Sequence, residues 1–168
     1  MEKKLFKVVI TAIVVKSGFL GGDQGKQFLV LQRGANEKKF PNRWTVPGGK
    51  LTTEDYIHGQ KETPHYWYDV LEKALRREVK EEAGIEIENI RYVTSLADYE
   101  EDKDPSVVIS CLVDHASGEV VIQKEEMQGF KWVRLQEAQS LDLIEGIYEE
   151  LVMADRVLNG EKVGEWTQ

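Results

Sequence analysis

Three glutamates lie at a spacing that could hold a metal ion. Glu81 and Glu82 follow Glu78 by three and four positions, so on a helix the three carboxylates project from one narrow face. Like charges at these spacings repel one another, and a hard divalent cation with oxygen ligands, Mg²⁺ or Mn²⁺, relieves the repulsion. The stretch therefore predicts a metal platform; a solvated charged face is the alternative.

Periodicity predicts the helix that carries these glutamates. Apolar residues repeat at helical spacing over residues 69–83. Asp69 and Glu72, three residues apart, predict a capping box at its start. Gly84 follows the last turn, where a left-handed residue ends many helices. Upstream, Gly48 and Gly49 permit close backbone approach, and the alternative for them is a tight turn.

Strand patterns surround this helix and outnumber the helical ones. A mixed sheet with helices, an α+β architecture, is therefore expected, in one domain over residues 1–168. A hairpin turn is predicted at 18–23 and a long loop at about 50–68. The predicted strands are 4–15, 27–33, 44–46, 90–97, 106–113, 119–123 and 130–134, and the last helix is 142–158.

Composition narrows the classes of partner. The 168 residues carry a formal charge of −8, which argues against general nucleic-acid binding because a phosphate backbone selects basic surfaces. The lone Cys111 lies in an apolar run and reads as a buried thiol in a reducing compartment. No long apolar span or signal-peptide core is evident, so we expect no membrane partner and cytoplasmic residence. Whether the chain forms a homodimer stays open.

Two segments resemble the Nudix (MutT-like) hydrolase family. Residues 77–85, REVKEEAGI, match the second half of the Nudix box, R-E-U-x-E-E-x-G-U with U aliphatic, and residues 44–51, WTVPGGKL, look like its opening W-x-U-P-G-G-K-U. The resemblance implies an α/β/α sandwich with a mixed β-sheet. It also implies a pyrophosphohydrolase that acts on phosphoric anhydride bonds with Mg²⁺ or Mn²⁺.

The middle of the box departs from the family pattern. From Gly49 to Arg77 the chain runs 28 residues, where the family has 14, so the loop at about 50–68 is predicted to be enlarged. Counting back from Arg77 puts the family's missing glutamate at Asp69; counting forward from Gly49 puts it at Asp55. Asp69 is the preferred match because its spacing to Arg77 equals that of the family's glutamate. The alternative is that Asp69 only caps the helix.

The resemblance also assigns roles to individual residues. Glu81 and Glu82 would be the main metal ligands, Glu78 a third ligand or the group that activates water, and the Gly48 carbonyl a further ligand. Arg77 would orient a carboxylate, or form only a surface ion pair. The supporting positions are Gly49, Asp69 and Gly84, and the candidates for substrate binding are Arg33, Phe40 and Trp44, with core packing as the alternative for Trp44.

Many members add an acidic residue from a loop before the last strand. Glu126 is the preferred candidate here. Glu125 and the acidic turn at 100–104 compete with it, and two plain hairpin-loop carboxylates are the other reading. Aromatic and histidine side chains of the long loop could cover the substrate as a lid, namely His58, His65, Tyr66, Trp67 and Tyr68.

The expected function is hydrolysis of a small-molecule nucleotide. Mg²⁺-dependent cleavage of the pyrophosphate linkage of a nucleoside triphosphate or a related nucleoside diphosphate derivative is the first hypothesis. A nucleotide-sugar or dinucleotide pyrophosphatase is the second. The third is a Nudix-fold module that binds nucleotides for regulation without catalysis.

Overall fold

A mixed β-sheet organises the chain in the computed structural model, which describes residues 5–17, 25–101 and 103–162. In this part of the chain the sheet has seven strands, with the order β3-β2-β1-β6-β5; β4 pairs with β1 and β7 pairs with β2. β1 and β6 run parallel, and the other pairs are antiparallel. The strands are β1 (Lys7–Ser17), β2 (Lys26–Arg33), β3 (Trp44–Thr45), β4 (Gly48–Lys50), β5 (Glu86–Asp98), β6 (Ser106–Ser117) and β7 (Met127–Val133).

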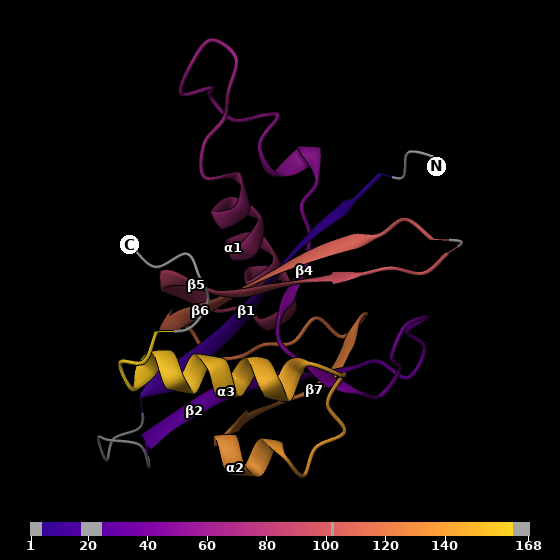
Figure 1. Cartoon of the computed structure of the whole chain (residues 1–168), viewed down its shortest axis with the longest axis vertical. Coiled ribbons are helices and arrows are strands. Elements are labelled where there is room, and N and C mark those ends of the chain that lie inside the picture. Colours follow the sequence, from indigo (N-terminus) through magenta and orange to yellow (C-terminus); the bar gives the residue numbers. More distant parts are fainter. Residues whose placement is uncertain (1–4, 18–24, 102, 163–168) are drawn as a thin grey trace.

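Helices cover the two faces of this sheet. α1 (Val70–Ala83) packs on one face, whereas α2 (Leu135–Ala138) and α3 (Ile147–Leu158) pack on the other. Figure 1 shows α3 crossing β1 and β2. The predicted α/β/α sandwich with a mixed sheet is confirmed. None of the described helices is long and apolar enough to cross a membrane.

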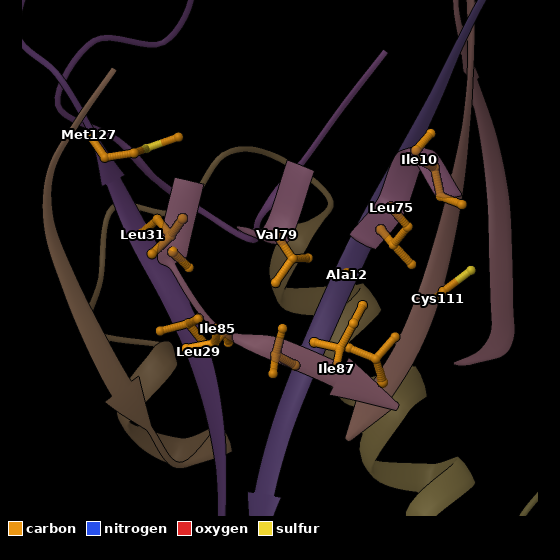
Figure 2. Close-up of a cluster of buried hydrophobic side chains, with 14 residues drawn as sticks. Ile10, Ala12, Leu29, Leu31, Leu75, Val79, Ile85, Ile87, Cys111 and Met127 are labelled. Atoms are coloured by element: carbon orange, nitrogen blue, oxygen red, sulfur yellow. The ribbon is translucent and has the colours of Figure 1, made fainter. Parts of the chain in front are cut away.

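Strand alternation builds a separate core on each face. Along β1, Ile10, Ala12 and Val14 point towards α1, and Ile13 and Val15 point towards α3. The α1 core appears in Figure 2, where helix side chains meet apolar side chains of β1 and β2. Cys111 belongs to this core as a buried free thiol, as predicted.

Three predicted elements differ in the structure. The segment 119–123 is not a strand: Val121 and Gln123 donate backbone hydrogen bonds to the carbonyls of Ala83 and Glu82 (2.9 and 3.1 Å), and so satisfy the end of α1. The last helix begins at Ile147 rather than at 142, because residues 142–144 extend alongside Trp44. The glycine pair forms β4. The turn expected at 18–23 lies outside the described residues.

The connection between β4 and α1, residues 51–69, packs largely on itself. It contains the 3-10 helix η2 (Thr53–Asp55). The rings of Tyr56 and Trp67 lie 5.3 Å apart, and the Trp67 indole N–H donates to the Gly59 carbonyl (3.1 Å). Figure 1 shows the connection projecting beyond the N-terminal end of α1. It is long, as expected, and internally bonded.

Candidate active site

The Glu82 carboxylate is buried between α1 and the glycine strand. Only 5% of Glu82 is exposed, and its Oε2 accepts the backbone N–H of Gly48 at 2.9 Å. Burial raises the pKa of Glu82 to about 8; the Gly48 hydrogen bond opposes this, while the charges of Glu78 and Glu126 add to it. The two halves of the predicted motif, 34 residues apart, therefore meet in space.

Glu78 lies beside the second glycine of β4. A Cβ at Gly49 would overlap the Glu78 carboxylate, so a larger residue there would push this carboxylate aside. Burial raises the pKa of Glu78, Arg77 opposes the shift, and the charges of Glu81 and Asp55 add to it. Glu81 is more open, since half of its side chain is exposed. All three predicted glutamates thus lie on the part of α1 that is next to β4.

Arg77 ties the carboxylates to one another. Its Nη1 lies 2.9 Å from both Glu78 Oε1 and Glu81 Oε2. Its Nε donates to Asp55 Oδ1, and its Nη2 donates to the Lys50 carbonyl at 3.2 Å. The Asp55 hydrogen bond, chiefly, raises the pKa of Arg77, which therefore stays charged. The guanidinium thus places two glutamates relative to β4.

Asp55, not Asp69, is the carboxylate that pairs with Arg77. The Asp55 side chain is 1% exposed. Asp69 occupies the N-cap of α1 in a left-handed conformation (φ 56°), and its side chain makes no capping hydrogen bond. The predicted capping box with Glu72 is therefore wrong, and so is the choice of Asp69 over Asp55. The position of Asp55, counted forward from Gly49, was the signal that could have identified it.

Glu126 comes close to this site from the turn before β7. Its carbonyl accepts the Gly34 N–H at 2.7 Å, and its charge raises the pKa of Glu82. Glu126 and the neighbouring Glu125 are both exposed. In the 100–104 turn, Glu100 pairs with Lys103. The charge of Glu126 acts on Glu82, so Glu126 stays the preferred prediction for the additional acidic residue.

The predicted substrate-binding residues occupy different surroundings. Arg33 ends β2 and pairs with Glu37 at 2.5 Å, and its charge favours ionised Glu82. Phe40 is 46% exposed, with a left-handed backbone (φ 50°). Trp44 packs partly into the α3 core, and the Lys131 ammonium lies 4.9 Å from its ring. Core packing, the alternative kept open for Trp44, is therefore observed.

The remaining predicted positions are structural or peripheral. Gly84 ends α1 with a left-handed backbone (φ 73°), and its N–H donates to the Lys80 carbonyl. In the long connection, Trp67 is packed against Tyr56, His58 contacts Glu54, and Tyr66 and Tyr68 are exposed.

The donor chemistry suits a hard divalent cation. Glu78, Glu81, Glu82 and Glu126 offer carboxylate oxygens and Gly48 a carbonyl, which are the ligands that Mg²⁺ and Mn²⁺ prefer. Over residues 5–17, 25–101 and 103–162, no three acidic, histidine or cysteine side chains are gathered as a closed metal cluster. Arg77 forms ion pairs with both Glu78 and Glu81.

The fold and this site define a class: α/β/α sandwiches in which a carboxylate-bearing helix packs on a glycine strand. The family model described as "NUDIX domain" matches residues 17–153. The chain therefore belongs to the Nudix family. This confirms the predicted resemblance to that family.

Individual relatives agree with this assignment. The chain is 39% identical over 66 residues to the NAD-capped RNA hydrolase NudC of Klebsiella pneumoniae, a match covering 39% of this chain and 24% of that protein. It therefore spans only about a quarter of this relative.

Solved structures share the fold. A MutT NUDIX hydrolase from Burkholderia pseudomallei superimposes with a TM-score of 0.67 and 20% identity, over 89% of this chain and 98% of that one. A C. elegans Ap4A hydrolase gives 0.64 and 23%, over 92% and 98%. At these identities the likeness concerns the fold.

Proposed function

We propose that the protein is a Mg²⁺-dependent hydrolase that cleaves the pyrophosphate linkage of a nucleoside triphosphate or a related nucleoside diphosphate derivative. The observation that carries this proposal is the hydrogen bond from Gly48 N to Glu82 Oε2 (2.9 Å), which brings the carboxylate helix against the glycine strand. Mn²⁺ would occupy the same oxygen ligands. A small nucleotide is the expected partner, and the buried free Cys111 suits a reducing, cytoplasmic compartment.

The cation would be held by carboxylates of α1. Glu81 and Glu82 are the main proposed ligands, with Glu78 and the Gly48 carbonyl completing the set. When bound, the cation would neutralise the diphosphate and stabilise the leaving oxygen. Because Arg77 holds Glu81 and Glu78 from one side, it would present their free oxygens to a ligand rather than contact the substrate.

The reaction adds water across one phosphoric anhydride bond. A water oxygen attacks one phosphorus, the bridging P–O bond breaks, and the leaving phosphate carries away the electron pair. Glu78 or Glu126 would accept the proton of the attacking water. Arg33, whose charge reaches Glu82, would bind a phosphate oxygen, and the exposed ring of Phe40 would stack on a base. Trp44 would contribute mainly by supporting that region.

A dinucleotide or nucleotide-sugar substrate is the second candidate. The match to the NAD-capped RNA hydrolase supports it, because that relative's name specifies a dinucleotide cap. The two candidates differ in products. A nucleoside triphosphate would give a monophosphate and pyrophosphate, whereas a dinucleotide or nucleotide sugar would give two phosphate monoesters.

A substrate screen tests the proposal directly. The protein would be incubated with Mg²⁺ or Mn²⁺ and with nucleoside triphosphates, oxidised nucleotides, nucleotide sugars, NAD and dinucleoside polyphosphates, with products identified by mass. Metal-dependent cleavage of an anhydride bond is expected. Tight nucleotide binding without turnover on the whole panel would instead favour the regulatory module.

A further inference from the structure

Glu150 is a buried carboxylate on α3 that the proposed reaction does not use. It is 6% exposed, and its Oε2 accepts a hydrogen bond from Ser110 Oγ at 2.6 Å. Ser110, on β6, is itself fully buried. A charged acceptor this far from solvent is costly unless its hydrogen bonds are made. Its hydrogen-bonding role therefore calls for explanation.

The hydrogen bond to Glu150 continues into β1. Thr11 Oγ1 donates to Ser110 Oγ at 3.0 Å, and these two residues face each other in the parallel β1–β6 register. Each hydroxyl thus donates towards the next acceptor, from Thr11 through Ser110 to Glu150. A fixed hydroxyl also fixes the rotamer of Thr11, and hence the direction of its Cγ2 methyl.

That methyl lies against the glycine strand. Gly48 pairs with Thr11, and a Cβ at Gly48 would come 2.7 Å from Thr11 Cα and 2.9 Å from its Cγ2. Gly48 therefore rests directly on Thr11, and its N–H reaches Glu82 on the opposite side of the sheet. The contacts form an unbroken line from α3, through β6, β1 and β4, to the helix that carries the proposed metal ligands.

We propose that Glu150 is a positioning residue for the active site. Through Ser110 and Thr11 it fixes β1 beneath Gly48, and thereby holds the Gly48–Glu82 contact from the opposite layer of the sandwich. The effect on metal binding rests on the proposed function; the effect on Gly48 does not. Groups that orient metal ligands commonly change metal affinity by about 10–100-fold when removed, and a more remote group should act more weakly.

Three variants separate positioning from general stability. Glu150→Leu removes the acceptor and keeps an apolar side chain. Glu150→Gln keeps a carbonyl oxygen for Ser110. Glu149→Gln is the matched control, because Glu149 is the exposed neighbouring carboxylate on α3. Amide hydrogen exchange at Gly48 measures the contact itself, Mn²⁺ affinity measures its consequence, and urea unfolding measures stability.

In Glu150→Leu, we expect exchange at Gly48 to be about tenfold faster and Mn²⁺ affinity to fall about three- to tenfold. Unfolding should shift to lower urea, because the buried Ser110 hydroxyl loses its acceptor. Glu150→Gln and Glu149→Gln should behave like wild type. If Glu150→Leu does not fold, Thr11→Val tests the next contact of the line: it removes the hydroxyl that donates to Ser110 at nearly constant shape and should reproduce both changes.

Two negative results have different meanings. Unchanged Gly48 exchange and Mn²⁺ affinity in a folded Glu150→Leu or Thr11→Val protein would overturn the positioning role. A wild-type protein that fails to bind Mn²⁺, with Gly48 exchange still accelerated in Glu150→Leu, would overturn the proposed metal function and leave the positioning of Gly48 standing.

Discussion

The pair formed by Asp55 and Arg77 should be a main support of the active site. The Asp55 side chain is 1% exposed and that of Arg77 31%, and Asp55 accepts hydrogen bonds from both Nε and Nη2 of the guanidinium. Hydrogen bonds to charged groups contribute about 1.5–3 kcal/mol each, and partial exposure of Arg77 reduces this. We therefore expect Asp55→Asn to lower the free energy of unfolding by about 2 kcal/mol.

The loss should also depend on pH. Burial acts to raise the pKa of Asp55, but the hydrogen bonds from Arg77 and Thr52 outweigh it and hold that pKa below its ordinary value of 3.8. A carboxyl with a lowered pKa stabilises the fold fully above its unfolded value, and this contribution is lost as pH falls through its folded value. The difference between wild type and Asp55→Asn should thus be full at neutral pH and shrink below about pH 3.8.

Urea denaturation of wild type, Asp55→Asn and Asp69→Asn measures these differences. Asp69 is the matched control, since its side chain makes no capping hydrogen bond, and its substitution should cost less than about 0.5 kcal/mol. A larger loss for Asp69→Asn than for Asp55→Asn would refute the assignment of the Arg77 partner.

Further outcomes follow from single contacts. Gly49→Ala should reduce turnover at least about tenfold in steady-state kinetics while circular dichroism stays native, because the added methyl displaces the Glu78 carboxylate. Phe40→Gly should raise the free energy of unfolding by up to about 1 kcal/mol, since it removes a bulky residue from a left-handed conformation, yet increase KM; a lower KM would contradict the stacking role. Burial raises the pKa of Glu150, so its contribution to stability falls as pH rises above 4.5; urea titrations across pH should show this slope flattened in Glu150→Gln.

Local sequence patterns predict much of the fold and the glutamates at the centre of the site. Helical spacing located α1 and its glutamates, and strand alternation located most of the sheet. Contacts between distant segments were harder to predict. Residues 119–123 look like a strand, but their N–H groups bond the end of α1, and nothing local shows that choice. Counting residues along the chain left both Asp69 and Asp55 as candidates for the partner of Arg77. Only the path of the connection between β4 and α1 shows that it is Asp55.

Residues of α3 were the least predictable part of the site. Glu150 follows Glu149 in an amphipathic helix, and its type and spacing indicate a surface carboxylate. It is buried where α3 packs on the sheet, and there it accepts a hydrogen bond from Ser110, 40 positions away in the sequence. The packing of helix on sheet, rather than helical periodicity, determines such a contact.

The most direct test of the active site is metal-dependent turnover of the best substrate by Glu82→Gln. The matched control is Glu137→Gln, an exposed carboxylate of α2. We predict a loss of about 10²–10³-fold in kcat for Glu82→Gln, with the fold intact and with Glu137→Gln close to wild type. Wild-type turnover by a folded Glu82→Gln protein would contradict the assignment of this helix and glycine strand as the site of diphosphate cleavage.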